Sequence, residues 1–477
     1  MYILDKIQKL PKGVKASGAL FIASIVTKGI AYITTPFYTR LLSAEEFGQV
    51  SVFLTWQNIL GIFAMFCLMN GVFNNGMVDY PNERDSYSFS ILILSNFITI
   101  VFLIVLTFCY SFFKTKVHIQ LYQIILMALT FLFKPAYDFW AARQRYELKY
   151  KATVIWSVIL SLASPIFAII AISVFQDEKV RARLIAGQGV MIVIYSLFYI
   201  YLATKNKFRV DFRFWKAAFL FNLPLIPHYL SALLLNSSDR IMISMMVSDS
   251  AAAYYSVAAS VASVVFIVWE AINSSLVPFT YECCKKGDYK SISKVTSLLL
   301  VLFGLACILL MLISPELVKI MATKEYAEAI YIIPPLVGGV FFQALYYVAA
   351  NIIYYYKKPK YVMIASLTAT ILNLILNYVF IYWFGYAVAA YTTLVCYAIQ
   401  ASIDFMALKK VTGTFVYNMK HICWLSLSII AASIVGGVLC RTTIIRYLII
   451  VAFLIIIVFN KNKMFTILRK LQKEISW

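Results

Sequence analysis

The chain has 477 residues, of which 62% are hydrophobic and only 13% charged, and its mean hydropathy is +0.83. This composition excludes a water-soluble globular fold, in which about 25% of the residues are charged. The net charge of +21 would suit nucleic acid only if the basic residues formed a binding face. They recur instead in short connections between apolar stretches, so no nucleic-acid partner is expected.

Apolar stretches that are long enough to cross a bilayer follow one another along the chain. Such a helix needs about 20 mostly apolar residues, because the hydrocarbon contains no water to pair with backbone amides. We therefore predict an all-α membrane protein with fourteen transmembrane helices. The predicted helices cover residues 16–38, 47–70, 88–113, 119–141, 152–175, 181–204, 214–246, 251–276, 291–314, 329–353, 360–383, 386–408, 420–440 and 443–460.

The connections between these helices alternate between rich and poor in basic residues. If the amino terminus is cytoplasmic, most of the Lys and Arg residues fall in cytoplasmic connections. This bias is the positive-inside rule, which sets the orientation of membrane proteins during insertion. It predicts an even number of helices and two cytoplasmic termini.

The first predicted helix carries Lys28 near its middle. A charged residue at the bilayer centre costs about 2.5–3.5 kcal/mol even on insertion scales, so it needs a wet cavity or a partner. Thr27 and Thr34 add polarity to the same helix. We expect Lys28 to line a cavity.

The helix predicted at 119–141 carries Lys134 and Asp138, one turn apart. Residues at this spacing lie on one face of a helix, so the two charges can neutralise each other. Pro135 between them removes a backbone donor and is expected to distort the helix. A structural ion pair is the favoured interpretation of these two residues.

Asp239 and Arg240 lie late in the helix predicted at 214–246. Adjacent residues point about 100° apart on a helix, so these two side chains are not expected to cancel each other. Glu270 lies in the next predicted helix and is a candidate either to face Arg240 or to bind a proton. The sequence leaves both roles of Glu270 open.

Three further features of the sequence concern bends and interfaces. The largest polar connection, Asn74 to Tyr87, is expected to be a cytoplasmic hinge. Asp404 and Gln400 are expected at the membrane interface, beside Lys409 and Lys410. The prolines that are expected to break or bend their helices are Pro36, Pro224, Pro227, Pro278, Pro334 and Pro335.

A weak internal repeat divides the chain, as is common in secondary transporters. A shift of 205 residues pairs Ser43 with Ser248, Ser51 with Ser256 and Val52 with Val257. In this register helices 1–6 match helices 7–12, which predicts two similar lobes and two additional helices. The predicted segments are an N-terminal lobe at 1–204, a cytoplasmic connection at 205–213, a C-terminal lobe at 214–410, helices 13 and 14 at 411–460 and a basic amphipathic tail on the inner leaflet at 461–477.

Several enzyme classes lack support in the sequence. No connection exceeds about fifteen residues, which leaves no room for a nucleotide-binding or catalytic domain, and neither a Walker loop nor a G-x-S-x-G elbow is present. The eight cysteines show no C-x-x-C spacing, and the three histidines are far apart. We predict no catalytic activity, no cofactor and no metal site, and many spans without soluble domains are typical of a channel or a secondary transporter.

Two regions of the sequence carry a resemblance to a known family. Their residues are Gly18-Ala19-Leu20, Lys28, Pro36 to Ser43, Glu46-Phe47-Gly48, Asp239 to Ile243, Ala252 to Ala258 and Pro278. They resemble the bacterial polysaccharide flippases, a family of the superfamily that also contains the multidrug and toxin extruders and the peptidoglycan-precursor flippases. The likeness extends over the whole chain, including the count of fourteen helices.

This resemblance implies two six-helix lobes in a V around a central cavity, plus two C-terminal helices. It also implies alternating access, in which undecaprenyl-diphosphate-linked oligosaccharides move from the inner to the outer leaflet of the bacterial cytoplasmic membrane for O-antigen, capsule or other surface polysaccharide. The implied partners are this lipid-linked substrate, membrane lipids, a polysaccharide polymerase and glycosyltransferases. The sequence leaves open whether Na⁺, H⁺ or the membrane potential drives the cycle.

Charged residues in the helices fit this implied function. A diphosphate is anionic, so a cavity that contains cations compensates its charge, whereas burial without a counter-charge would be prohibitive. The expected substrate-binding residues are Lys28, Arg240 and Lys134. The expected gate and coupling residues are Arg40 at an outer gate, Asp138, Asp239 and Glu270.

Two alternative functions remain at the level of the sequence. A multidrug or cation extruder of the same superfamily would bind a cation with an unpaired acid, for which Asp138 or Glu270 is available. A membrane-embedded polymerase or glycosyltransferase would form sugar bonds, whereas a flippase leaves its substrate unchanged.

Overall fold

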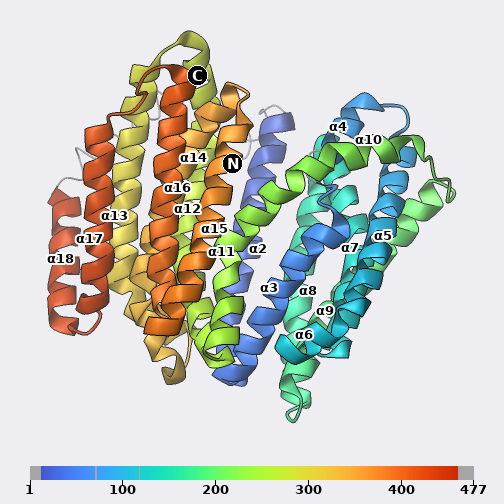
Figure 1. Cartoon of the computed structure of the whole chain (residues 1–477), viewed down its shortest axis with the longest axis horizontal. Coiled ribbons are helices and arrows are strands. Elements are labelled where there is room, and N and C mark those ends of the chain that lie inside the picture. Colours follow the sequence, from blue (N-terminus) through green and yellow to red (C-terminus); the bar gives the residue numbers. More distant parts are fainter. Residues whose placement is uncertain (1–11, 70–71, 118, 460–477) are drawn as a thin grey trace, which may run out of the picture. The chain divides into compact units, whose positions relative to one another are not determined.

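The computed structural model of the protein describes residues 12–69, 72–117 and 119–459, so the tail predicted at 461–477 lies outside the described residues. Every element in these residues is a helix (Figure 1). In chain order they are α2 (Lys12–Leu41), α3 (Ala44–Met65), α4 (Val72–Asp79), α5 (Arg84–Phe108), α6 (Tyr110–Lys116), α7 (Leu121–Tyr146), α8 (Tyr150–Val174), α9 (Lys179–Lys205), α10 (Arg213–Asn222), η1 (Leu223–Leu225), α11 (Ile226–Met246), α12 (Asp249–Lys286), α13 (Tyr289–Met321), η2 (Lys324–Tyr331), α14 (Ile333–Tyr355), α15 (Pro359–Phe384), α16 (Val388–Thr412), α17 (Met419–Leu439) and α18 (Thr443–Phe459).

Twelve spans in the described residues are long and apolar enough to cross a membrane, so the protein is a multi-pass membrane protein. The predicted count of fourteen is not confirmed. The stretch predicted at 47–70 forms α3, which is not one of the twelve, and the apolar part of α18 covers only Thr443–Ala452.

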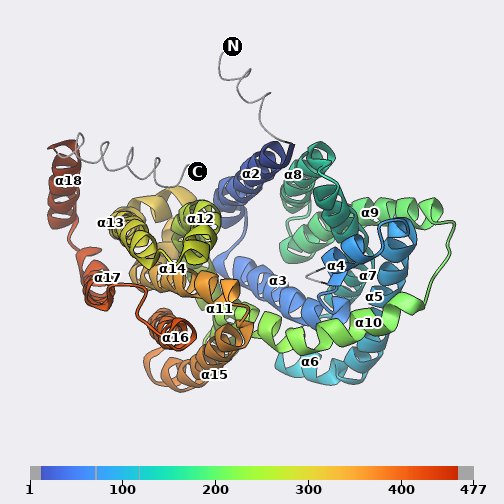
Figure 2. The same ribbon diagram turned by 90° about the horizontal axis from the view of Figure 1, so that it is seen from above.

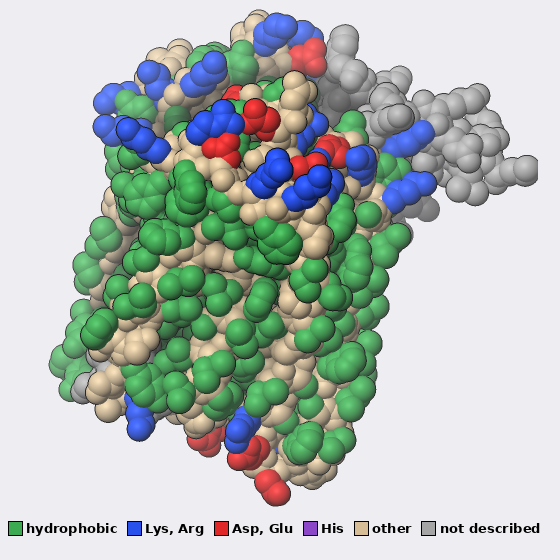
Figure 3. All heavy atoms as spheres, turned by 90° about the vertical axis from the view of Figure 1, so that its right-hand side faces the viewer, with side chains coloured by type: hydrophobic (Ala, Val, Ile, Leu, Met, Phe, Trp, Pro, Cys, Tyr) green, Lys and Arg blue, Asp and Glu red, His purple; other side chains and the backbone are tan. Residues whose placement is uncertain are grey.

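A belt of hydrophobic side chains covers the face that Figure 3 shows, over α5, α7 and α9. Lys, Arg, Asp and Glu side chains gather at the two ends of this face and leave the belt between them free of charge (Figure 3). Large apolar side chains are exposed along one stripe of α5, at Phe97, Ile100, Val101, Ile104 and Val105. A soluble protein would not leave such a surface in water, whereas lipid solvates it.

The chain divides into two compact units, unit 1 at Met1–Leu234 and unit 2 at Leu235–Trp477, and the boundary lies within α11. This division describes the packing of the helices, and the lobe bounds predicted from the repeat remain a prediction. In unit 1, α7 packs against α3, α4, α5, α8 and α9 (Figure 2). In unit 2, α14 packs against α12, α13, α15, α16 and α17.

The polar connection predicted as a hinge is in fact packed in unit 1. Its first half forms α4, which lies on α5, α7 and α10. The Tyr87 hydroxyl donates a hydrogen bond to the Val72 carbonyl at 2.9 Å, and Phe73 stacks on Phe139 with 4.7 Å between ring centroids. Gly76 is required there because a Cβ would overlap the Tyr87 ring. Phe73 and Tyr87 are buried although the sequence of this connection is polar, and its role as a hinge stays a prediction.

The prolines act in two different ways. Pro224 lies in η1, where a 3₁₀ turn separates α10 from α11, so the predicted break in this span is confirmed. Pro334 and Pro335 do not bend a helix, because they occupy the first positions of α14. A missing N–H costs nothing there, since the first amides of a helix have no intrahelical partner.

Ser43 and Ser248, one of the pairs that the repeat predicts, have the same structural role. Ser43 is the N-cap of α3, and its hydroxyl accepts the amide of Glu46 at 3.2 Å. Ser248 is the N-cap of α12, and its hydroxyl accepts the amide of Ala251 at 3.1 Å. Each hydroxyl satisfies an amide that the helix itself leaves unpaired. The register of the repeat therefore aligns two helix starts that are capped in the same way.

Candidate functional site

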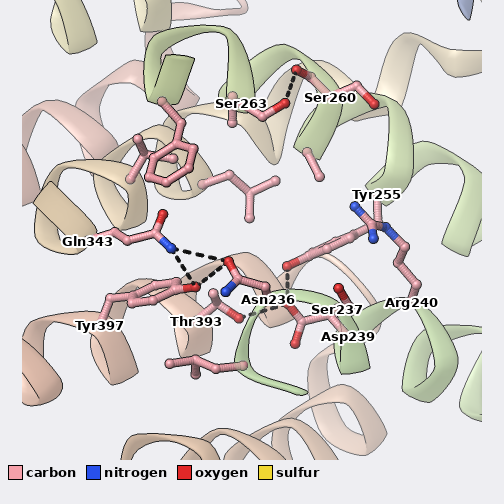
Figure 4. Close-up of a pocket in the computed structure, with 16 residues that line it drawn as sticks. Asn236, Ser237, Asp239, Arg240, Tyr255, Ser260, Ser263, Gln343, Thr393 and Tyr397 are labelled. Atoms are coloured by element: carbon pink, nitrogen blue, oxygen red, sulfur yellow. Dashed lines mark hydrogen bonds between the residues drawn. The ribbon is translucent and has the colours of Figure 1, made fainter. Parts of the chain in front are cut away.

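Asp239 lies at the centre of a buried polar cluster in unit 2. The side chain is only 1% exposed, although it belongs to a membrane-spanning helix. Its carboxylate accepts hydrogen bonds from the Tyr255 hydroxyl and from Thr393 Oγ1 at 2.9 Å (Figure 4). It also accepts one from Asn377 Nδ2 at 2.6 Å. These donors come from α12, α15 and α16, so one carboxylate joins four helices. Hydrogen bonds to a carboxylate are stronger than those between neutral groups, and they offset part of the cost of burial.

A second layer of polar side chains holds these donors in place. Asn373 Nδ2 donates to Thr393 Oγ1 at 3.0 Å, and Asn377 Nδ2 is 3.3 Å from Asn373 Oδ1. The Thr392 hydroxyl donates to Asn377 Oδ1. Asn373 and Asn377 are one turn apart on α15, and both are fully buried. Buried polar groups of this kind rigidify a core only when all of them are paired, as most are here.

One turn before Arg240, Asn236 begins a second network toward α14 and α16. Its Oδ1 accepts the Tyr397 hydroxyl at 2.6 Å, and Gln343 Nε2 lies 3.3 Å from the same oxygen (Figure 4). The amide side chain therefore connects α11 to both helices. Asn236 and Arg240 share one face of α11, since four residues make about one turn.

Arg240 lines a cavity of about 250 Å³ together with Asn236, Asp239, Tyr255 and Gln343. Its guanidinium lies beside the Tyr255 ring in Figure 4. Among the described residues it forms no hydrogen bond or ion pair, and its Nε is buried without a partner. Asp239 and Arg240 therefore do not cancel each other, as the spacing predicts, and Arg240 forms no ion pair with Glu270 in the described part of the chain. A cation in this position is available to a polar or anionic ligand.

The oxygen atoms of the Asp239 cluster are also suited to a hard cation. Carboxylate, amide and hydroxyl oxygens are the ligands that such ions prefer. A half-turn of the Asn377 amide would replace its N–H donor by a carbonyl oxygen beside the Asp239 carboxylate. The described residues contain no group of three His, Cys, Asp or Glu side chains that could hold a metal ion.

In unit 1, Lys134 and Asp138 form an ion pair, with Lys134 Nζ 2.5 Å from Asp138 Oδ2. Both side chains line a cavity of about 150 Å³, together with Pro135 and Cys67. The structure thus confirms the pairing that the sequence predicts. In this arrangement each charge compensates the other.

The other predicted site residues lie apart from these two cavities. Lys28 is half-buried on α2, which packs against α8 in unit 1. Arg40 is exposed in the last turn of α2, and its Nη1 donates to the Pro36 carbonyl at 2.8 Å. Glu270 is half-buried on α12, next to the fully buried Trp269, and is not among the residues that line the cavity of unit 2. The roles of these residues remain predictions.

Sequence reasoning missed the neutral half of the cluster. Most of its donors come from Asn373, Asn377, Thr393 and Tyr397, which carry no charge that would mark them in an apolar sequence. One signal was available: two Asn residues one turn apart in an apolar helix indicate a buried polar face, because each unpaired amide would be costly in lipid.

The described residues thus form a multi-pass membrane protein with a buried polar cavity inside one of two helical units, as in membrane transporters. A family model described as polysaccharide biosynthesis protein matches residues 14–283, and a MatE model matches residues 224–379. The chain belongs to the polysaccharide biosynthesis protein family.

Relatives of known sequence are distant. The chain is 21% identical over 369 residues to Lsg locus putative protein 1 of Haemophilus influenzae, which covers 75% of this chain and 88% of that protein. It is 23% identical over 437 residues to the probable low-salt glycan biosynthesis flippase Agl15 of Haloferax volcanii, with 89% of each chain covered.

Two solved structures share the fold. The inward closed conformation of the lipid II flippase MurJ matches with a TM-score of 0.68 at 15% identity, over 93% of this chain and 99% of that chain. An inward-facing multidrug resistance MATE family transporter of the MOP superfamily matches with a TM-score of 0.62 at 12% identity, over 83% of this chain and 99% of that chain. The fold is therefore the one that these transporters share.

Proposed function

We propose that this protein is a flippase that moves undecaprenyl-diphosphate-linked oligosaccharides from the inner to the outer leaflet of a bacterial cytoplasmic membrane by alternating access, with both termini in the cytoplasm. Membership of a polysaccharide biosynthesis family, the fold of the lipid II flippase and a relative named as a glycan biosynthesis flippase support this proposal. In it, the two lobes form a V around a central cavity, and a polymerase and glycosyltransferases of surface polysaccharide synthesis act on the same substrate.

The observation that carries the proposal is Arg240. A guanidinium stays charged in any protein environment, so a membrane protein that buries one without an ion pair needs another source of compensation. The cavity beside Arg240 is lined by amide and hydroxyl groups, which suit phosphate oxygens and sugar hydroxyls. In our proposal Arg240 contacts the diphosphate, Lys28 and Lys134 add positive charge, and Arg40 serves an outer gate.

Coupling in this proposal uses the acidic residues. The Asp239 cluster holds a carboxylate whose donors exchange for a cation when the Asn377 amide turns, which makes it the candidate coupling site. Glu270 and Asp138 are the other predicted coupling residues. Because Asp138 already has Lys134 as its partner, it contributes only after that pair has separated.

Flipping of a fluorescent undecaprenyl-diphosphate-linked disaccharide in proteoliposomes tests the function. Arg240→Ala is expected to lower the flipping rate about tenfold or more, because a hydrogen bond to a charged group is worth about 1.5–3 kcal/mol. Arg240→Lys should retain part of the rate. The matched control is Arg209→Ala, which removes the same charge from an exposed connection. Equal rates for the protein and Arg240→Ala would contradict the assigned role, and absence of flipping by the unaltered protein would contradict the function.

A multidrug or cation extruder is the second candidate, and the MatE match at residues 224–379 favours it. An extruder of cations needs an acid that is open to its substrate, and Asp138 is paired instead. Transport of the lipophilic dye ethidium by the same proteoliposomes, with no flipping of the lipid-linked sugar, would establish this alternative.

A further inference from the structure

Asp404 is an acid in the interior of unit 2 that none of the roles above uses. The side chain lies on α16 and is fully buried, and neither carboxylate oxygen has a hydrogen-bond partner among the described residues. The sequence predicts it at the membrane interface, and the structure adds that its side chain is buried among helices. The opposite face of α16 carries exposed residues such as Met406, so helical phase turns Asp404 inward.

The two lysines that follow Asp404 do not compensate its charge. Lys409 Nζ lies 4.2 Å from the centroid of the Phe415 ring, and Lys410 Nζ lies 5.6 Å from that of Tyr361. Neither forms an ion pair with Asp404 in the described residues. An ionised carboxylate without a counter-charge is prohibitive in such a place, so the group has to be neutral there.

Gln400 provides the second observation. It lies one turn before Asp404 on the same face of α16, is only 3% exposed, and has an Oε1 without a donor. An amide oxygen accepts hydrogen bonds, and a carboxyl group gains an O–H donor only when it is protonated. One proton therefore removes the charge of Asp404 and supplies the donor that Gln400 lacks.

The groups that face Asp404 from the neighbouring helices are neutral. On α14, the hydroxyl groups of Tyr346 and Tyr354 are close enough to interact electrostatically with Asp404. On α15, the ring of Tyr361 lies beside the ammonium group of Lys410. No basic group of α14 or α15 pairs with Asp404 in the part of the chain that the structure describes.

We propose that Asp404 and Gln400 form a proton-carrying site in unit 2. In the packed state the carboxyl group binds one proton and donates it as a hydrogen bond to Gln400 Oε1. Release leaves a carboxylate that needs water, so α14 and α16 have to separate before the proton leaves. The proton is the only species gained or lost. Use of this proton to drive transport rests on the proposed function, whereas its presence on Asp404 does not.

Infrared difference spectroscopy of the purified protein in nanodiscs tests the protonation. The carbonyl stretch of a protonated carboxyl group is expected at neutral pH in the unaltered protein and is expected to be lost in Asp404→Asn. Gln400→Leu should shift the same band, because the O–H of the Asp404 carboxyl group loses its acceptor. This variant provides a second measurement if Asp404→Asn misfolds. The control, Asp249→Asn, removes a carboxyl group at the start of α12 and should leave the band in place. A band that is unchanged in both Asp404→Asn and Gln400→Leu would overturn the proposal.

A pH gradient across the same proteoliposomes tests the use of the proton. One pH unit is worth about 1.36 kcal/mol for each proton, so it should change the flipping rate by up to about tenfold. Asp404→Asn is expected to abolish this response. A response that persists in Asp404→Asn would overturn the coupling role. If the unaltered protein shows the infrared band but flips nothing, the proton site stands and the proposed function fails.

Discussion

The two units neutralise buried charge in different ways. In unit 1, opposite charges meet directly, as Lys134 does with Asp138 and Arg143 with Glu147. In unit 2, Asp239 is held by neutral donors from three helices, and Asp404 has no partner among the described residues. An ion pair compensates both of its charges while it is intact, whereas a carboxyl group among neutral groups has no counter-charge and depends on hydrogen bonds or on a bound proton or cation. The charges of unit 1 thus compensate each other, whereas these carboxyl groups of unit 2 lie among neutral groups.

One ion pair of unit 2 belongs with those of unit 1. Arg446 is 2% exposed on α18, and its Nη2 lies 2.5 Å from Glu316 Oε1 on α13. The Tyr447 hydroxyl donates to the same oxygen at 2.8 Å. These contacts attach α18 to α13, so they fix the place of a peripheral helix, and they lie outside the polar cluster.

The same substitution in each unit provides the strongest test of this contrast. Asp239→Leu leaves the three donors of its carboxylate unpaired, and each unsatisfied buried donor costs about 1–3 kcal/mol, so we expect a loss of about 3–5 kcal/mol in the free energy of unfolding. Asp138→Leu should cost only about 1 kcal/mol, because the side chain of Lys134 is 36% exposed and can reach water. Unfolding by dodecyl sulfate in mixed micelles measures both. Equal losses would remove the distinction between the units.

A double-mutant cycle sharpens the comparison within unit 1. Lys134→Met, Asp138→Asn and the double variant isolate the coupling energy of the pair, which we expect at about 0.5–1 kcal/mol for a half-exposed ion pair. The same unfolding assay measures it, at low and at high salt. A coupling energy near zero at low salt would show that the pair contributes no stability, and Asp138 would then be free for the extruder function.

The smallest effect is expected at the C-terminal end of α7. Burial raises the pKa of Glu147, but hydrogen bonds from Lys149 and Arg143 outweigh this effect and hold the pKa below the ordinary glutamate value. A carboxyl group with a lowered folded pKa stabilises the protein fully above its unfolded pKa, and this stabilisation is lost as the pH falls through the folded pKa.

Glu147→Gln should therefore lower the free energy of unfolding by less than about 1 kcal/mol at neutral pH, because the group is near the surface. The difference from the unaltered protein should vanish below the folded pKa. Thermal unfolding at a series of pH values measures this difference, and one that is independent of pH would contradict the assignment.

The fold was predictable from the sequence to the extent that lipid dictates it. Long apolar stretches had to become helices, and the break at Pro224 and the pair Lys134–Asp138 follow from local rules that need no neighbours. The packing of Asn74–Tyr87 was not predictable, since its burial depends on Phe139, far along the chain.

The candidate site was predictable only in part. Asp239 and Arg240 stand out because ionisable residues in a span are costly. Their environment depends on four helices that approach one another only in the folded protein, so no local rule assigns Asn377 or Thr393 to Asp239. Asp404 shows the same limit. The nearby lysines do not reveal that the helical phase of α16 turns its carboxyl group into the interior of the helix bundle.

The capping serines are the part of the predicted repeat that has a counterpart in both units. Apolar residues exchange freely against lipid, so similarity between two halves of a membrane protein would fade quickly along the spans. A helix start instead favours side chains that accept an amide hydrogen bond, and Ser43 and Ser248 both do so. Internal repeats in membrane proteins should therefore be sought at helix starts as well as along the spans.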